Sequence, residues 1–116
     1  MNMLEQRLRE IADRDIEELL VKDAEYNSSW KKRGGTGAFH QGIARKWDRL
    51  EELVKRFNYD LFAAIRNNMD PKSPLRDSIG DLRRYLALID AEVMAWSSID
   101  STDGMDSPFG YDPEDP

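Results

Sequence analysis

The chain has 116 residues, enough for one domain with a modest hydrophobic core, and it contains no cysteine. Disulfides, thiolate metal sites and cysteine nucleophiles are therefore excluded. No apolar run approaches the roughly 18–20 residues of a membrane span, and the first residues lack a signal-peptide pattern, so we expect a cytoplasmic protein without a membrane partner.

The net charge of −6 belongs to the end of the chain rather than to its body. Residues 97–116 contain six acidic residues and no basic ones, together with Gly, Pro and Ser, a composition typical of disorder. Residues 1–96 carry equal numbers of acidic and basic residues. We therefore expect one domain over 1–96 and an acidic, disordered tail over 97–116. The neutral body argues against nucleic acid as a partner.

Apolar periodicity predicts helices along the whole domain. Residues 3–28 carry an apolar stripe with one change of phase, so they form one long helix or two helices joined near 13–15. A second helix is expected from about Thr36 to Phe57, and a short third helix over 61–67. A last helix is expected from about Pro74 to Trp96, because proline is tolerated in a first turn. No stretch has the pattern of a strand, which predicts an all-α four-helix bundle.

The second and last helices carry regular apolar seams. In the second helix the seam residues follow one another at steps of three and four, which predicts the face that packs into the core. They are Phe39, Ile43, Trp47, Leu50, Val54 and Phe57. Apolar faces this wide in so small a body favour burial between copies, so a homodimer or homotetramer is expected.

The segment 28–37 combines three consecutive cations with three glycines. This composition predicts a loop, with Thr36 as a candidate N-cap of the next helix. Cations, free backbone N–H groups and a helix N-terminus favour anions, so one interpretation is a loop that contacts phosphate. The other is an ordinary connection with solvated lysines, and composition does not choose between them. The segment is not a P-loop, because its cations precede the glycines.

Two acidic pairs lie beside the two seams. Asp48 and Glu51 are spaced i, i+3, and Asp77 and Asp81 are spaced i, i+4. If the two helices pack together, four carboxylates converge on one groove and repel each other unless cations bind between them. Mg²⁺ and Mn²⁺ prefer such oxygen ligands. The structural alternative is that Asp77 complements the helix dipole and that Asp81 pairs with Arg84 or Arg83.

Three stretches resemble those of the all-α nucleoside triphosphate pyrophosphohydrolases of the MazG type. The likeness is strongest to small phage members and to the phage nucleotide-modification-associated domain, and it covers roughly residues 15–96. The stretches are KDAEYNSSWKKRGGTGAF, ARKWDRLEEL and DSIGDLRRYLALIDAEV. The residues that match the phage motif are Lys22, Glu25, Tyr26, Ser29, Trp30, Lys46, Asp81, Leu82 and Tyr85.

The resemblance implies a MazG-like bundle and the hydrolysis of a nucleoside triphosphate between its α- and β-phosphates. The products would be a nucleoside monophosphate and pyrophosphate, and Mg²⁺ or Mn²⁺ would assist the reaction. Relatives in phages that carry diaminopurine in place of adenine convert dGTP to dGMP. The implied substrate is therefore dGTP, in phage nucleotide-pool or DNA-base modification.

The MazG pattern also assigns roles to the acidic pairs. Its metal-binding acids fall here on Asp48, Glu51, Asp77 and Asp81, with Glu51 and Asp81 as the catalytic acids. Trp47 and Ser78 stand where that pattern has glutamates, so one ligand is missing or comes from elsewhere. Glu25 is the candidate replacement.

Six residues are assigned to the substrate by the same resemblance. The cations would contact its phosphates and the aromatic residues would stack on its base; they are Lys22, Lys31, Arg33, Lys46, Trp30 and Tyr85. The competing hypothesis is a non-catalytic helical module that binds nucleotide or RNA through the KKRGG segment and Trp30, since basic and aromatic residues together suit stacking and phosphate contact.

Overall fold

A computed structural model describes residues 2–26 and 29–103, and the side chains of 2–23 and 29–97. In these ranges every regular element is helical and no strand occurs, which confirms the predicted all-α class. The elements are α1 (Met3–Tyr26), the 3₁₀ turn η1 (Ser29–Lys31), α2 (Gly34–Gly37), the π-helical segment η2 (Ala38–Ala44), α3 (Arg45–Lys55), α4 (Leu61–Arg66) and α5 (Pro74–Asp103).

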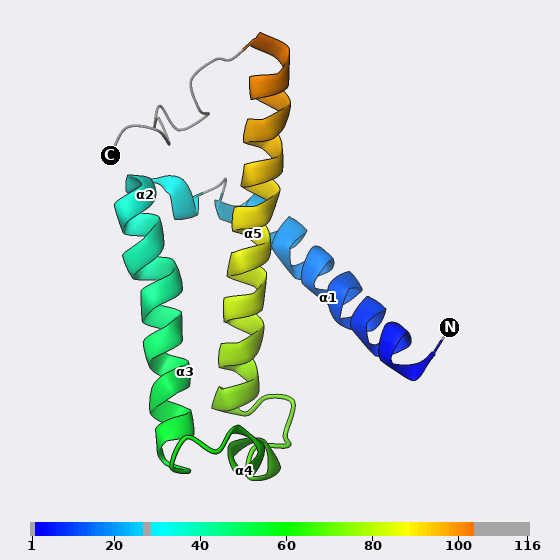
Figure 1. Cartoon of the computed structure of the whole chain (residues 1–116), viewed down its shortest axis with the longest axis vertical. Coiled ribbons are helices and arrows are strands. Elements are labelled where there is room, and N and C mark those ends of the chain that lie inside the picture. Colours follow the sequence, from blue (N-terminus) through cyan, green and yellow to red (C-terminus); the bar gives the residue numbers. More distant parts are fainter. Residues whose placement is uncertain (1, 27–28, 104–116) are drawn as a thin grey trace.

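Four helical bodies result, because α2, η2 and α3 follow one another without a break. This α2–η2–α3 column runs antiparallel to α5 and lies beside it, and α4 crosses the end where the two are connected (Figure 1). The α1 helix approaches α5 from another side and runs away from it at an angle. Within the described residues, none of the helices is long and apolar enough to cross a membrane.

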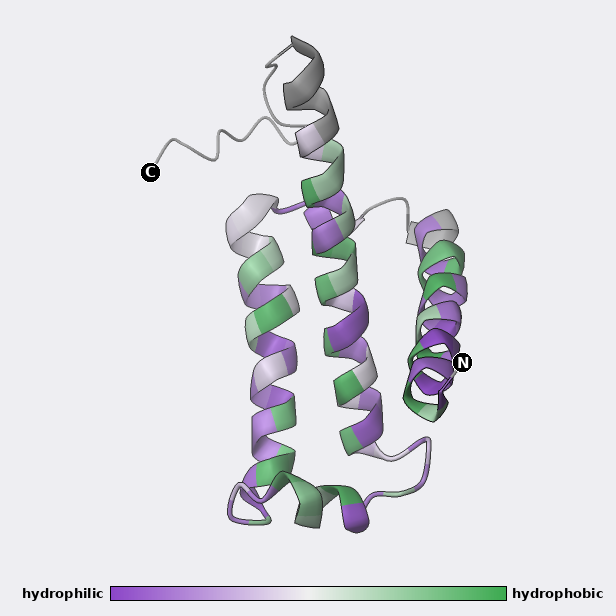
Figure 2. Cartoon of the chain, turned by 45° about the vertical axis from the view of Figure 1, so that its right-hand side comes forward, coloured by the Kyte–Doolittle hydropathy of each residue, from purple (hydrophilic) through white to green (hydrophobic). Residues whose placement is uncertain are grey.

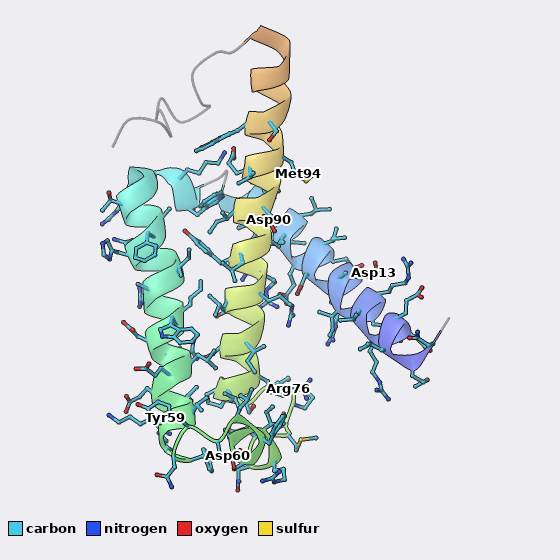
Figure 3. All side chains as sticks on the ribbon, in the orientation of Figure 1. Asp13, Tyr59, Asp60, Arg76, Asp90 and Met94 are labelled. Carbon is cyan, nitrogen blue, oxygen red and sulfur yellow. The ribbon has the colours of Figure 1, made fainter. Side chains whose placement is uncertain are left out.

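Local signals in the sequence set most of the helix ends. Asp60 caps α4, because its Oδ1 accepts a hydrogen bond from the Ala63 amide at 3.1 Å. Ser73 does the same for α5: its Oγ accepts from the Arg76 amide at 3.3 Å, and Pro74 follows in the first turn. The chain reverses between α3 and α4 through Asn58 and Tyr59, both with positive φ (Tyr59 is labelled in Figure 3).

The start of the second helix and the end of the last helix differ from the predicted ones. The second helix begins at Gly34 rather than near Thr36, because Gly34 adopts φ +73° and turns the chain directly into α2. Thr36 therefore lies inside that turn and is not its N-cap. The last helix continues past Trp96 to Asp103, into the segment predicted to be a disordered tail. Residues 104–116 of that tail lie outside the described residues.

The predicted seam of the second helix is only partly buried. Phe39 and Trp47 are each 52% exposed, whereas Gly42 is buried against α5. A π-helical segment holds more residues per turn than an α-helix, so η2 changes the phase of the column relative to an ideal 3.6-residue period. The face toward α5 therefore includes Lys46 and Arg49 instead of Trp47.

Little apolar surface is buried within one chain. Among the described residues the buried apolar side chains are Ala64, Leu75 and Tyr85. Hydrophobic residues alternate with hydrophilic ones along α1, which stands clear of the α3–α5 pair in Figure 2. Along α1, Leu8 is 56% exposed and Leu20 66% exposed, and Met94 on the outer side of α5 is 71% exposed (Figure 3).

Candidate functional site

A cavity of about 320 Å³ lies where η1, α2, η2, α3 and α5 meet. Three cations, two aromatic rings and several small polar residues surround it, a combination that suits a ligand with a flat ring and negative charge. The residues that line it are Ser29, Trp30, Lys32, Arg33, Gly37, Gln41, Gly42, Lys46 and Tyr85.

Tyr85 forms the inner wall of this cavity and joins α5 to η2. Its hydroxyl donates a hydrogen bond to the Ala38 carbonyl oxygen at 2.7 Å. Its ring lies so close to Gly42 that a methyl group on Gly42 would overlap it. Burial raises the pKa of Tyr85, which keeps the hydroxyl protonated as a donor. Tyr85 is therefore a fixed wall that positions the other residues, and η2 is shaped around it.

Trp30 stands edge-on to Tyr85, with ring centroids 5.6 Å apart and planes at 76°. Lys46 Nζ lies 5.9 Å from the centre of the Tyr85 ring, a cation–π distance. Lys31 Nζ lies 5.8 Å from the Trp30 ring and contacts both carboxylate oxygens of Glu92, at 3.1 and 2.9 Å. The Lys31–Glu92 ion pair thus links η1 to α5.

Of the six residues assigned to the substrate, four line this one cavity. They are Trp30 in η1, Arg33 in the turn before α2, Lys46 in α3 and Tyr85 in α5. Lys31 is not among the lining residues, because it is engaged with Glu92. Lys22 is exposed on α1 and does not line the cavity either.

A second cavity, of about 450 Å³, lies between the column and the first turns of α5. It shares Gln41 and Lys46 with the first cavity, so the two are neighbours. Its lining residues are Gln41, Arg45, Lys46, Arg49, Ser78 and Asp81.

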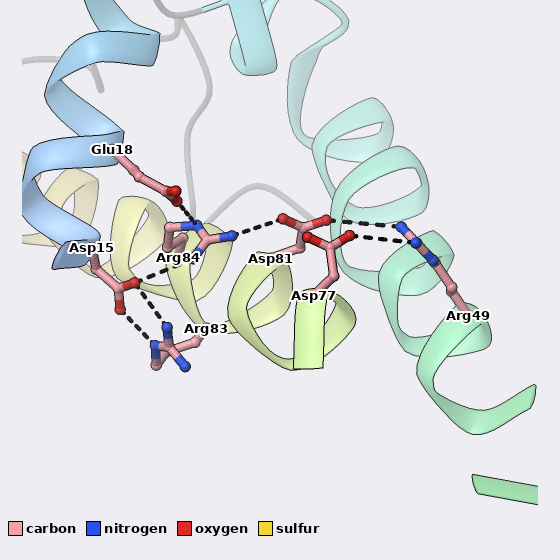
Figure 4. Close-up of polar contacts among 7 residues, drawn as sticks. All are labelled: Asp15, Glu18, Arg49, Asp77, Asp81, Arg83 and Arg84. Carbon is pink, nitrogen blue, oxygen red and sulfur yellow. Dashed lines mark hydrogen bonds and ion pairs between the residues drawn. The ribbon is translucent and has the colours of Figure 1, made fainter. Parts of the chain in front are cut away.

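A chain of ion pairs runs from α1 across α5 to α3 (Figure 4). The Asp15 carboxylate accepts from Arg83 Nε at 2.6 Å and Nη2 at 2.9 Å, and this hydrogen bonding holds the pKa of Asp15 below its ordinary value against the opposing effect of burial. Arg84 lies next in the chain, with Nε 2.9 Å from Glu18 and Nη2 2.9 Å from Asp81.

Arg49 ends this chain on the α3 side. Its guanidinium lies 3.4 Å from the Asp77 carboxylate and 3.9 Å from that of Asp81. Asp81 therefore pairs with Arg84, as the structural alternative predicted, and Arg49 faces both Asp77 and Asp81 from α3.

The four predicted metal ligands do not converge within one chain. Asp48 and Glu51 are exposed on α3, and helical periodicity places Glu51 about 200° around the helix from Arg49, which faces α5. Among the described side chains no three His, Asp or Glu residues come close enough to hold a metal ion. These acids stay apart because of the rotation of the α2–η2–α3 column about its own axis. That rotation points Arg49 toward α5, where the predicted site needed Asp48 and Glu51. The Glu25 side chain lies outside the described residues.

The described carboxylates of a single chain thus do not fit the Mg²⁺ or Mn²⁺ site that the resemblance implies. Asp77 and Asp81 supply two neighbouring carboxylates, and Arg49 balances their charge.

Sequence reasoning missed four residues of the second cavity, namely Gln41, Arg45, Arg49 and Ser78. The first three follow one another at steps of four, the spacing of one helix face, so a polar ridge was visible in the sequence. Ser78 belongs to no such ridge, and the sequence marked it only as a position where the family pattern has a glutamate.

No protein-family model, no curated protein and no solved structure matches this chain. The resemblance to the MazG-type enzymes rests on the sequence motifs described above.

Proposed function

We propose that this chain binds a nucleoside triphosphate in the cavity between Trp30 and Lys46 and hydrolyses it to the nucleoside monophosphate and pyrophosphate. The observation that carries the proposal is that Trp30, Arg33, Lys46 and Tyr85 converge on one cavity from three helical elements and the turn before α2. The Trp30 ring offers a face or edge to the base, and Arg33 and Lys46 offer positive charge to the phosphates.

In the proposed reaction a water oxygen bonds to the α-phosphorus and the bond from that phosphorus to the bridging oxygen breaks. Pyrophosphate departs with the bridging oxygen, and the protons of water are released to solvent. dGTP is the first substrate to test, following the resemblance, and the activity would serve a cytoplasmic, phage-type nucleotide pool. Arg33, Lys46 and the cations of the neighbouring cavity would hold the triphosphate and offset its charge.

Mg²⁺ or Mn²⁺ remains part of the proposal as a cofactor that would neutralise phosphate charge when bound. Asp77 and Asp81 are the candidate ligands from α5. Further carboxylates would have to come from Glu25 or from a second copy, to which the exposed Asp48 and Glu51 of α3 are accessible.

We also propose that the chain works as a homodimer or homotetramer with a MazG-like arrangement. Support comes from the exposed apolar surface of α1 and from an apolar hollow of about 550 Å³ between η2 and the later turns of α5. Phe39 and Val93 at its edge are 52% and 51% exposed. Self-association would remove both surfaces from water.

The proposed activity is tested by incubating the protein with each dNTP and NTP in the presence of Mg²⁺ or Mn²⁺ and separating the products. We expect a monophosphate and pyrophosphate as products, and we expect EDTA to abolish their formation.

Lys46→Gln should reduce kcat/KM by about tenfold or more, because a charge-assisted contact to phosphate contributes about 1.5–3 kcal/mol. Lys55→Gln, which removes a charge from the same helix at an exposed position, is the matched control and should retain activity.

Two further variants test the assigned acids. Asp81→Ala and Glu51→Ala should both abolish turnover if these residues hold the metal in an assembled oligomer. Full activity of Glu51→Ala would remove that residue from the site. Absence of turnover with every nucleotide would contradict the enzymatic proposal as a whole.

A non-catalytic nucleotide-binding module is the second candidate. It is favoured by Arg49, which already balances the charge of Asp77 and Asp81 without a metal. This candidate predicts nucleotide binding that EDTA does not change and that Lys46→Gln weakens, with no product formed.

A further inference from the structure

The cavity between the column and α5 has the charge of an anion site. Arg45, Lys46 and Arg49 contribute three cations to its lining, and Asp81 contributes one carboxylate. That carboxylate is already balanced, since Arg84 Nη2 lies 2.9 Å from it on the side of α5. The lining is therefore net positive, and a ligand that carries negative oxygens is favoured over a cation.

Ser78 provides an independent sign that a ligand belongs there. Its side chain is 1% exposed, and its Oγ makes no hydrogen bond to any described residue. A buried hydroxyl without a partner is uncommon and costly, so such a group calls for an explanation. Ser78 borders the cavity, where an acceptor oxygen of a ligand would satisfy it.

Arg49 can turn toward such a ligand at little cost. Its contacts with Asp77 and Asp81 are long, at 3.4 and 3.9 Å, and its side chain is 53% exposed. Ion pairs this exposed stabilise a protein only weakly. Lys46 lines both cavities and therefore links this one to the cavity that holds Trp30.

We propose that the cavity lined by Arg45, Lys46, Arg49 and Ser78 binds the β- and γ-phosphates of the nucleotide, with Ser78 Oγ donating a hydrogen bond to a phosphate oxygen. This inference rests on the proposed function for the identity of its ligand, and it assigns Ser78 a role as a phosphate-binding residue. The base would then lie near Trp30, the α-phosphate near Lys46, and the departing pyrophosphate would already be in the second cavity.

The test uses inorganic tripolyphosphate and pyrophosphate as probes, with affinity measured by titration calorimetry on the full chain. The wild type should bind both, and Ser78→Ala should lower the affinity for tripolyphosphate by about tenfold or more, the effect of losing one charge-assisted hydrogen bond. The midpoint of thermal unfolding of Ser78→Ala should stay unchanged or rise, because the variant removes a buried hydroxyl that lacks a partner in the free protein.

Ser73→Ala is the matched control, because Ser73 is a buried serine at the N-cap immediately before the same helix. The Ser73 hydroxyl donates to the Asn68 carbonyl at 3.0 Å and caps α5, so its loss should lower the unfolding midpoint and leave the affinity for tripolyphosphate unchanged.

Arg45→Gln is a second cavity variant, at an exposed position, and it tests the site if Ser78→Ala does not fold. It should weaken binding and reduce its dependence on salt, whereas Lys55→Gln should do neither.

The outcomes separate this inference from the proposed function. Equal tripolyphosphate affinity in the wild type, Ser78→Ala and Arg45→Gln overturns the phosphate site, even if nucleotides are hydrolysed. Binding of tripolyphosphate that depends on Ser78 or Arg45 supports the site, even if no nucleotide is turned over. Absence of tripolyphosphate binding by the wild type also overturns it.

Discussion

Gly42 and Tyr85 decide how the α2–η2–α3 column meets α5. The Tyr85 ring occupies the space that a side chain at position 42 would need, and the Tyr85 hydroxyl donates a hydrogen bond to the Ala38 carbonyl oxygen. Side chains that insert into a helix are a known cause of departures from regular α geometry, and π-helical segments are frequent at functional sites. The position of Lys46 and Arg49 on the α5 side follows from this contact.

At the scale of single residues we predict that Gly42→Ala destabilises the protein, whereas Gly35→Ala does not. The added methyl group at position 42 overlaps the Tyr85 ring, and overpacking of this kind costs about 1–3 kcal/mol. A methyl group at position 35 in the same column meets no atom within 4 Å. The free energy of unfolding in urea measures both. Equal stability of the two variants would contradict the close approach of Gly42 and Tyr85.

At the scale of elements, α1 is fastened to α5 by charge rather than by apolar packing. Asp15 is buried and takes two hydrogen bonds from Arg83, and Glu18 pairs with Arg84 (Figure 4). Ile16, between these acids, is 54% exposed. The attachment of α1 should therefore depend on the ionisation of Asp15.

We predict that Asp15 stabilises the fold at neutral pH and that this contribution disappears in acid. Because the hydrogen bonds from Arg83 lower the pKa of Asp15 in the folded chain, the stabilisation is complete above the unfolded pKa of about 3.9 and is lost as the pH falls through the lower folded value. Asp15→Asn should cost about 1–3 kcal/mol at pH 7, and this cost should decrease as the pH falls below about 3.9 toward pH 2. Urea unfolding across this pH range measures the difference from wild type.

Asp13→Asn is the control for this experiment, since Asp13 lies on the exposed side of the same helix (Figure 3). It should have little effect at either pH. A stability difference between wild type and Asp15→Asn that stays constant from pH 7 to pH 2 would show that the ion pair with Arg83 does not form.

At the scale of the whole molecule, a single chain buries too few apolar side chains for the number it carries. Three are buried among the described residues, whereas large apolar residues of α1, η2, α3 and α5 remain exposed. A protein with this surface normally buries it against another molecule. Self-association would also bring Asp48 and Glu51, on the outer side of α3, near a second chain. The proposed metal site needs further carboxylate ligands of this kind.

We therefore predict that the protein is a dimer or tetramer in solution, as measured by light scattering coupled to size-exclusion chromatography. Ile16→Glu combined with Leu20→Glu places two charges on one exposed face of α1 and should shift the mass toward the monomer. Glu17→Gln, on the same helix, should leave the mass unchanged. A monomeric wild type at all concentrations tested would contradict the proposed assembly.

The sequence by itself determined where helices form and most of their ends. Asp60 before α4 and the Ser73-Pro74 step before α5 act on neighbouring backbone groups, so their effect is local and readable from the chain. The apolar periodicity that predicted the four helices is equally local. Four of the six residues that the family resemblance assigns to the substrate line one cavity, and their role there remains a proposal.

Only the tertiary structure decided which side of the α2–η2–α3 column faces α5. An ideal period placed Phe39 and Trp47 in the core and the acids on its shoulder, but the contact of Tyr85 with Gly42 and the π-helical geometry of η2 present Lys46 and Arg49 to α5 instead. That contact joins residues from two separate helices, so no local pattern encodes it. For the same reason Asp77 and Asp81 lie opposite an arginine, and the cavity beside them carries the charge of a phosphate site.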